Sequence, residues 1–116
     1  MFTERLLQHF KDPKNVGELP PPAVTVEVCN PACGDILRLS VRFEDGFVVE
    51  AGYKARGCTA SIAAGSALTE LLVGRARQAL RSLTARDIEA ALGGLPPESK
   101  HAAVLCHDAV KALLMQ

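Results

Sequence analysis

The sequence predicts a small α+β domain in which a three-stranded antiparallel sheet packs against several helices. Three segments that alternate apolar and polar residues follow one another between residues 24 and 54, and helical spacing dominates the rest of the chain. At 116 residues the chain can bury about two thirds of its unfolded surface, so it needs no disulfide to fold. We therefore expect one domain spanning residues 1–116.

The first elements are a helix and a connector. A helix is predicted over residues 2–10, because Phe2, Leu6 and Phe10 recur every four residues. The following segment, residues 14–22, ends in three prolines and is predicted to be a connector with no core of its own.

Three strands form the predicted sheet. Residues 24–29 alternate valines with other residues, which is typical of a half-buried strand and places Cys29 on the face away from the valines. The same alternation continues over residues 37–44 and 47–54. Asp45-Gly46 between them is a hairpin turn signal. The sequence therefore predicts an antiparallel meander.

The rest of the chain is predicted to be helical. The segments are residues 60–72, residues 75–81, residues 83–92, and a terminal helix opened by residues 95–99. Thr84, three residues before Asp87, indicates a capping box for the third of them. In the terminal helix Cys106 shares an apolar face with Leu105 and Ala109, so we expect it in the core.

Composition excludes several classes of partner. Thirteen basic and thirteen acidic residues give zero net charge, and no run of one sign would follow a nucleic-acid backbone or an anionic membrane. No segment is long and apolar enough to span a bilayer, and the first ten residues do not resemble a signal peptide. We expect a cytoplasmic protein with no nucleic-acid or membrane partner, whose four cysteines favour metal or sulfur chemistry over disulfides.

The segment of residues 30–35 carries the first candidate ligands. It places Cys33 and Asp35 two residues apart on a shaped loop, because Pro31 fixes its own φ and Gly34 admits conformations closed to other residues. A cysteine beside a glycine and an acid is also common in ordinary turns.

Cys58 and His101 are the other candidates. Cys58 follows Gly57 at a helix start, where free N–H groups favour a thiolate, although a buried structural cysteine is the alternative. His101 lies near the start of the terminal helix, and a lone histidine there also fits a surface or core role. With Cys33 and Asp35 they offer two thiolates, an imidazole and a carboxylate, a set that suits zinc or a labile iron–sulfur unit.

Several motifs occur in a characteristic order. They are residues 9–17, residues 30–35, residues 56–61, and Leu95-Pro96-Pro97 leading to His101 and residues 108–112. In these motifs the chain resembles the IscU/NifU/SufU family of iron–sulfur cluster assembly scaffolds along essentially its whole length. The resemblance implies a SufE/NifU-like fold in which the ligands gather at one exposed end.

The resemblance also implies a function. Such a protein is a scaffold or carrier, and not itself an enzyme, which accepts sulfur from a cysteine desulfurase and passes a transient [2Fe–2S] cluster to recipient apoproteins. Cys33, Cys58, His101 and Asp35 are its implied ligands for the cluster, for iron or for zinc, with Asp35 as the weak ligand. The sulfurs of Cys33 and Cys58 are then expected within about 4 Å of each other, around one metal.

The chain departs from the family at the terminal helix. The family carries a third ligand cysteine directly after the position of His101, where this chain has Ala102. We expect Ala102 at a solvent-facing helix start, so that Ala102→Cys would restore a ligand. In the IscU branch the Leu-Pro-Pro segment continues into a Val-Lys pair and is recognised by a dedicated chaperone. Here it continues into Glu98-Ser99, which argues against delivery by that chaperone. Members of the SufU branch carry a sizeable insertion between the second and third ligand cysteines. The short run from Cys58 to His101 therefore argues against that branch.

Two alternative functions remain open at this point. One is a zinc-binding sulfur-acceptor module, and the other is a protein-interaction relic that no longer holds a cluster. Cys29 is expected to neighbour the ligand loop, with an auxiliary role in carrying sulfur as the alternative. The sequence determines neither the recipient proteins nor the oligomeric state.

Overall fold

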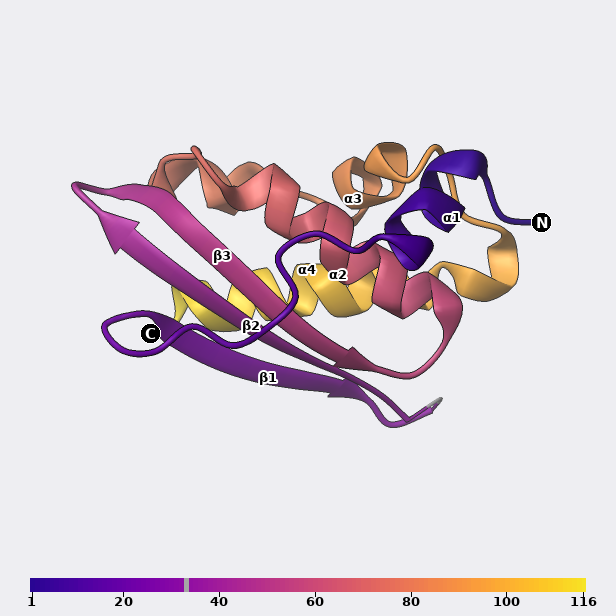
Figure 1. Cartoon of the computed structure of the whole chain (residues 1–116), viewed down its shortest axis with the longest axis horizontal. Coiled ribbons are helices and arrows are strands. Elements are labelled where there is room, and N and C mark those ends of the chain that lie inside the picture. The colour runs from indigo at the N-terminus through magenta and orange to yellow at the C-terminus, as the bar shows by residue number, and fades with distance from the viewer. Residues whose placement is uncertain (33) are drawn as a thin grey trace.

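A sheet of three antiparallel strands forms one layer of the molecule (Figure 1). The structure is a computed structural model and describes residues 1–32 and 34–116. The strands, in the order β1-β2-β3, are β1 (Val24–Asn30), β2 (Asp35–Glu44) and β3 (Phe47–Arg56). The helices are α1 (Glu4–Lys11), α2 (Thr59–Leu72), α3 (Ala85–Ala91) and α4 (His101–Leu114), with 3₁₀ helices η1 (Arg77–Ser82) and η2 (Pro97–Ser99). The predicted fold class is confirmed.

The strands of the sheet follow one another as two antiparallel pairs. Asn30 pairs with Asp35 where β1 turns into β2. At the opposite end of the sheet, Asp45 and Gly46 connect β2 to β3 with φ angles of 54° and 81°. Two successive positive φ angles are the requirement of a type I′ turn, which matches the twist of the strands. The Asp-Gly turn predicted from the sequence is confirmed.

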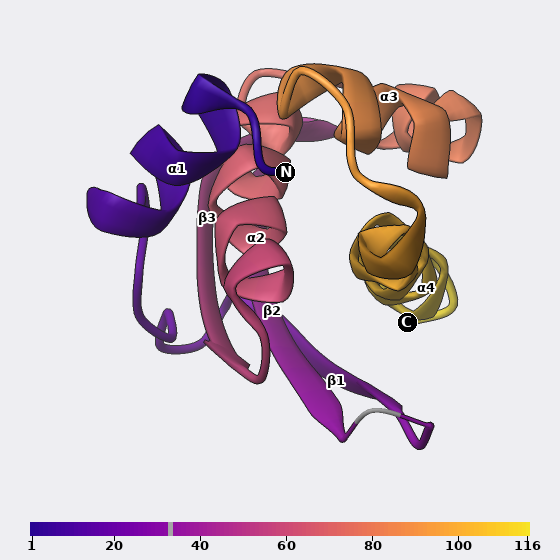
Figure 2. The same ribbon diagram turned by 90° about the vertical axis from the view of Figure 1, so that its right-hand side faces the viewer.

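The helices cover one face of the sheet. Figure 2 shows the sheet curving around α2 and α4, with α2 packed on β3 and α4 packed on β1 and β2. Helices α1 and α3 pack in turn on α2 and α4. The side chains of β2 that face the helices, Leu37, Leu39 and Val41, are at most 1% exposed. Small residues let α2 approach the sheet closely, and its most buried alanines are Ala60, Ala63, Ala64 and Ala67.

Helix α1 differs from the prediction in its apolar stripe. Thr3 caps the helix by accepting a hydrogen bond from the N–H of Leu6. Leu6 is fully buried and Phe2 packs against the core, as the four-residue spacing predicted. Phe10, however, is 38% exposed. The helix ends one residue later, at Lys11, so only the first part of the predicted stripe packs against the core.

The segment predicted as a connector pairs with the sheet. None of the residues 14–22 is buried, so it has no core of its own. Its backbone nevertheless continues the sheet beyond β3. The N–H of Gly17 donates to the carbonyl of Tyr53 at 2.8 Å, and the N–H of Tyr53 donates to the carbonyl of Asn15 at 2.9 Å. The segment thus protects part of the β3 edge.

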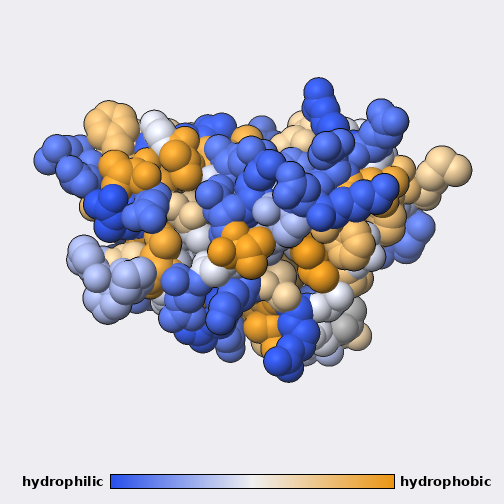
Figure 3. All heavy atoms as spheres, viewed as in Figure 1, coloured by the Kyte–Doolittle hydropathy of each residue, from blue (hydrophilic) through white to orange (hydrophobic). Residues whose placement is uncertain are grey.

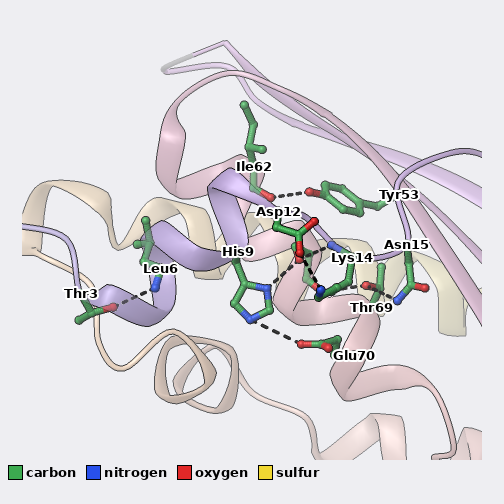
Figure 4. A network of polar contacts seen from close by, with 11 residues as sticks. Thr3, Leu6, His9, Asp12, Lys14, Asn15, Tyr53, Ile62, Thr69 and Glu70 are labelled. Atoms are coloured by element: carbon green, nitrogen blue, oxygen red, sulfur yellow. Dashed lines mark hydrogen bonds and ion pairs between the residues drawn. The ribbon is translucent and has the colours of Figure 1, made fainter.

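Side chains from α1 and this segment also bind α2 (Figure 4). Ser66 accepts the N–H of Lys14 at 2.8 Å and lies 2.7 Å from Nδ1 of His9. Nε2 of His9 faces Glu70 at 3.5 Å, and the amide of Asn15 donates to Thr69 at 3.0 Å. These contacts give the motif of residues 9–17 a structural role, which is to hold α1 and the β3 edge against α2.

The helices of the second half follow the prediction with one change. The capping box between Thr84 and Asp87 is present at the start of α3. The terminal helix, predicted to open at residue 95, begins only at His101, because η2 intervenes. The buried face of α4 contains Leu105, Cys106 and Ala109, as predicted, and also Ala102 and Leu113.

The surface is mainly hydrophilic on the face shown in Figure 3, with separate hydrophobic patches between the polar residues. Exposed apolar side chains include Val16, Phe47, Val49 and Val73. Among residues 1–32 and 34–116, no helix has the length and apolar character needed to cross a membrane.

Candidate metal centre

Three elements bring potential metal ligands to one end of the molecule. Asp35 is the first residue of β2, Cys58 precedes the first residue of α2, and His101 is the first residue of α4. This is the end where the arrowheads of β1 and β3 lie in Figure 1. One ligand atom from each of the three residues lies within 4.8 Å of the other two.

The separations between these ligand atoms match a small tetrahedral site. Sγ of Cys58 lies 3.3 Å from Oδ2 of Asp35 and 3.4 Å from Nε2 of His101, and the Nε2–Oδ2 distance is 3.2 Å. Metal bonds of about 2.3 Å to sulfur and about 2.0–2.1 Å to nitrogen and oxygen would separate tetrahedral ligand atoms by about 3.3–3.6 Å. The three atoms therefore form one face of such a site with little rearrangement.

Asp35 forms the floor of the site. Its side chain is only 3% exposed. Oδ2 accepts a hydrogen bond from the hydroxyl of Ser61 at 2.5 Å, and Oδ1 accepts one from the N–H of Cys58 at 3.3 Å. Cys58 is the N-cap residue of α2 and makes no side-chain capping bond of its own. Asp35, at the start of β2, thus caps α2, and its charge lies at the positive end of the helix dipole.

These surroundings keep Asp35 ionised. Burial alone raises the pKa of a carboxyl group, since it disfavours the charge. Here the hydrogen bonds from Ser61 and Cys58, together with the charge of His101, outweigh burial, and the pKa of Asp35 falls below the usual 3.8. The carboxylate is therefore available as a ligand at neutral pH.

Gly57 permits the close approach of Asp35 to the start of α2. Its φ is +143°, and a Cβ at this position would lie less than 3.0 Å from Oδ1 of Asp35. Any larger residue would be strained and would displace the carboxylate. The glycine before Cys58 is therefore a requirement of the site.

The site is open to solvent above Asp35. Cys58 is exposed, and the side chain of His101 is 27% exposed. A metal or a sulfur donor can therefore reach the thiol and the imidazole from outside. The arrangement combines two accessible ligands with a buried carboxylate that the protein holds in place.

Three of the four predicted ligands come together in the structure. Asp35, Cys58 and His101 lie side by side, although their separations in the sequence match no short zinc motif. Cys33 lies outside the described residues, so its distance from Cys58 stays a prediction. That Asp35, Cys58, His101 and Cys33 bind a metal is likewise a prediction, and the geometry makes it testable.

The terminal helix corrects one expectation and supports another. Ala102 is not solvent-facing but fully buried, because it lies on the face of α4 that packs against the rest of the domain. Cys106 is 1% exposed, and burial raises the pKa of its thiol to about 12. It is a core residue, as predicted. Cys29 is exposed opposite Ile36 at the end of β1 that leads toward Asp35, consistent with its predicted place beside the loop.

Sequence reasoning missed Ser61. This residue is 1% exposed, and its hydroxyl lies 3.4 Å from Sγ of Cys58 as well as touching Asp35. A signal was present in the sequence, because residues three apart on a helix share a face and Ser61 is the third residue after Cys58. The segment around Ser61 consists mainly of small residues, so a serine there is also explained by packing alone and did not stand out.

Comparisons with known proteins show to which family the chain belongs. The family model of the NifU-like N-terminal domain matches residues 1–116. The bifunctional protein NifU/MnmA of Rubrobacter xylanophilus is 44% identical over 94% of this chain, which spans only 23% of that protein's length. The cluster assembly scaffold protein IscU of Aquifex aeolicus is 36% identical, with 99% of this chain matching 77% of that protein, and IscU 1 of Archaeoglobus fulgidus is 30% identical, at 99% and 75%.

A solved structure shares the fold. The scaffold protein for the SUF system from Fervidobacterium islandicum has a TM-score of 0.77 at 19% identity, covering 96% of this chain and 94% of its own. At that identity the likeness concerns the fold alone and does not decide between branches. The family model and the relatives that match nearly the whole chain show that this protein belongs to the family of NifU-like N-terminal domains.

Proposed function

We propose that this domain is an iron–sulfur cluster assembly scaffold or carrier. It binds iron or a transient [2Fe–2S] cluster through Cys58, His101 and Asp35, together with Cys33, which precedes Asp35 by two residues in the sequence. The observation that carries the proposal is the group of thiol, imidazole and carboxylate atoms within 4.8 Å of one another at an exposed end of the fold. Relatives that carry the name of cluster assembly scaffold support it.

The donor set suits a cluster that is held for a limited time. Thiolate and imidazole bind iron well, whereas a carboxylate is a harder ligand that exchanges more readily on a thiophilic metal. A cluster in this site is cargo and must leave. The exposed Cys58 and His101 would let a recipient protein approach the cluster while Asp35 remains inside the fold.

The chemistry of sulfur release belongs to a partner in this proposal. A cysteine desulfurase supplies the sulfur, iron–sulfur apoproteins receive the cluster, and the domain itself has no catalytic turnover. Relatives are named scaffold proteins, although the one from Drosophila melanogaster is named an assembly enzyme.

A second candidate function is a zinc-binding sulfur acceptor. The distances between the ligand atoms of Cys58, His101 and Asp35 favour it. At 3.2–3.4 Å, they are close to the distances between ligand atoms around a tetrahedral zinc ion. In this role Cys58 or Cys33 would take up sulfur while no cluster is assembled.

Anaerobic reconstitution separates the two candidates. The protein is incubated with a cysteine desulfurase, cysteine, ferrous iron and a dithiol reductant that reduces the persulfide sulfur to sulfide, then desalted and analysed for iron, zinc, acid-labile sulfide and visible absorption. Equal amounts of iron and sulfide with charge-transfer absorption support the scaffold. Zinc alone would support the sulfur acceptor and reject the scaffold.

Two variants make the assignment specific. Cys58→Ser should lose the cluster. Cys29→Ser removes an exposed thiol that lies outside the ligand group and should keep it. Equal cluster loss in both would contradict the proposed site.

A further inference from the structure

Ser61 lies directly behind the candidate ligands and has no role in the proposed function as stated so far. Its hydroxyl donates to Oδ2 of Asp35 at 2.5 Å and lies 3.4 Å from Sγ of Cys58. Both Ser61 and Asp35 are nearly inaccessible, at 1% and 2% exposure. We propose that Ser61 is a positioning residue, which orients the carboxylate of Asp35 so that Oδ2 presents a free lone pair to the metal. This inference rests on the proposed function.

The hydrogen bonds of Asp35 leave its carboxylate little freedom. An ionised carboxylate only accepts hydrogen bonds, so the Ser61 hydroxyl must be the donor. Oδ1 is held by the N–H of Cys58 at 3.3 Å. Oδ2 also accepts from the thiol of Cys58 at 3.3 Å, so each oxygen has at least one donor and the group cannot rotate about its terminal torsion without losing a hydrogen bond. Hydrogen bonds to both oxygens therefore hold the carboxylate of Asp35 in the orientation seen in the structure.

The second lone-pair site of Oδ2 faces the other candidate ligands. A carboxylate oxygen has two lone-pair sites, and Ser61 uses one on Oδ2. Nε2 of His101 and Sγ of Cys58 lie 3.2 Å and 3.3 Å from the same oxygen. A metal that replaces the thiol proton of Cys58 and binds these two atoms would therefore meet Oδ2 at the lone-pair site that Ser61 does not use. Hydrogen bonds of this kind, behind a ligand, typically strengthen metal affinity by about 10- to 100-fold.

The surroundings of Ser61 indicate that its hydroxyl serves Asp35 and not the packing of α2. Neighbouring positions on the buried side of the helix are alanines, such as Ala60, Ala63 and Ala64. An alanine would suffice there if only volume mattered. Among residues 1–32 and 34–116, the Ser61 hydroxyl makes side-chain hydrogen bonds with Asp35 and Cys58 alone.

The test is a double-mutant cycle read by metal affinity. Zn²⁺ and Co²⁺ are titrated, in competition with a chromophoric chelator, into the metal-free wild type, Ser61→Ala, Asp35→Ala and the double variant. We expect Ser61→Ala to weaken Zn²⁺ binding about tenfold in the wild-type background and to change nothing when Asp35 is already alanine. The thiolate-to-cobalt absorption band should persist, because Cys58 still binds.

Two further variants separate positioning from structure. Ser66→Ala makes the same substitution on the same helix, but its fully buried hydroxyl contacts His9 and Lys14 instead of the site. It should lower thermal stability and leave Zn²⁺ affinity unchanged. Ser61→Thr keeps the hydroxyl and should restore affinity to within about threefold of wild type.

The outcomes distinguish this inference from the proposed function. If wild type binds neither metal, the proposed function fails. If wild type binds both and Ser61→Ala binds them equally well, Ser61 does not position a ligand and the inference is overturned. An equal loss in the wild-type and Asp35→Ala backgrounds overturns it as well, since Ser61 would then act on something other than Asp35.

Discussion

The ring of Tyr53 on β3 packs directly against the backbone of Gly65 on α2. A Cβ at residue 65 would lie less than 3.0 Å from two ring carbons of Tyr53. The Tyr53 hydroxyl also donates to the carbonyl of Ile62 at 2.8 Å, and burial, with a smaller effect of Cys106, raises the pKa of Tyr53 to about 12. These two contacts fix the distance between α2 and β3, and with it the place of Cys58 beside Asp35.

Gly65→Ala should therefore destabilise the protein. In an ordinary helix this change stabilises by about 1 kcal/mol, because glycine is a poor helix former. Here the added methyl group collides with the ring of Tyr53, and we expect the free energy of unfolding to fall by about 1–3 kcal/mol. Urea denaturation measures the change. In the background of Tyr53→Leu the loss should be smaller, and an increase in stability on Gly65→Ala would show that the packing is looser than described.

Gly57→Ala should weaken metal binding more than it weakens the fold. The new Cβ would displace Oδ1 of Asp35 at a φ of +143°, so the carboxylate must leave its place beside Cys58. We expect a loss of at least about tenfold in Zn²⁺ affinity. Gly74→Ala is the control, because it has a similar positive φ of +91° but nothing within 4 Å of the added atom. Similar affinities for the two variants would contradict the role of Gly57.

Periodicity predicted the elements that bury side chains. The alternation around Leu37, Leu39 and Val41 and the helical spacing of α4 each reflect a face turned to the core, so the three strands and the main helices were found. The pairing of residues 15–17 with β3 was missed for the converse reason. It is made by backbone groups of Asn15, Gly17 and Tyr53, and such bonds leave no pattern in side-chain type.

The candidate site was predicted in part. Cys58, His101 and Asp35 were identified because they lie in motifs whose order resembles that of the scaffold family, since each residue alone also fits an ordinary structural role. Ser61 was not found, because a small polar residue in a helix is compatible with packing alone. The exposure predicted for Ala102 was wrong, because the buried face of α4 already includes this second residue of the helix.

The cysteines should differ sharply in reactivity. Cys106 is 1% exposed and burial raises its pKa to about 12, so its thiolate is scarce and inaccessible at pH 8. Cys29 and Cys58 are exposed. Iodoacetamide treatment of the native, metal-free protein followed by peptide mapping should label Cys29 and Cys58, and should label Cys106 only after unfolding. Labelling of native Cys106 at the rate of Cys29 would be incompatible with a core position.

Cys106→Ala should then change stability and not metal binding. Removing a buried sulfur leaves a small cavity, at a cost of about 1–2 kcal/mol in the free energy of unfolding. Zn²⁺ affinity should equal that of wild type, because Cys106 is not one of the three clustered donors among the described residues. A loss of Zn²⁺ binding would mean that α4 shifts when the metal enters.

Asp35 should contribute a pH-dependent share of the stability of the metal-free protein. Its pKa in the fold lies below 3.8, so the unfolded chain binds the proton more readily. The contribution is complete well above pH 3.8 and is lost as the pH falls through the lower, folded-state pKa. Asp35→Asn should therefore be less stable than wild type at pH 6, and the difference should shrink toward pH 3. A constant difference across this range would mean that the charge of Asp35 adds nothing to stability.

Ala102→Cys tests the family's third ligand position against the burial seen in this chain. Ala102 is fully buried in the first turn of α4, directly after His101. A sulfur atom added there overfills the core, and the free energy of unfolding of the metal-free protein should fall by about 1–3 kcal/mol. A metal that binds only the folded state stabilises it more when its affinity is higher. If the new thiol reaches the metal, Zn²⁺ should raise the Tm of this variant by more than it raises that of wild type.

Ala103→Cys is the matched control for this prediction. Ala103 is 2% exposed, so the packing cost should be similar, but it lies about 100° further around the helix than Ala102. Its Tm shift on adding Zn²⁺ should equal that of wild type. If Ala102→Cys and Ala103→Cys show the same shift, the thiol at residue 102 does not reach the metal. The first turn of α4 would then contribute His101 alone, and the donor set would consist of His101, Cys58, Asp35 and Cys33.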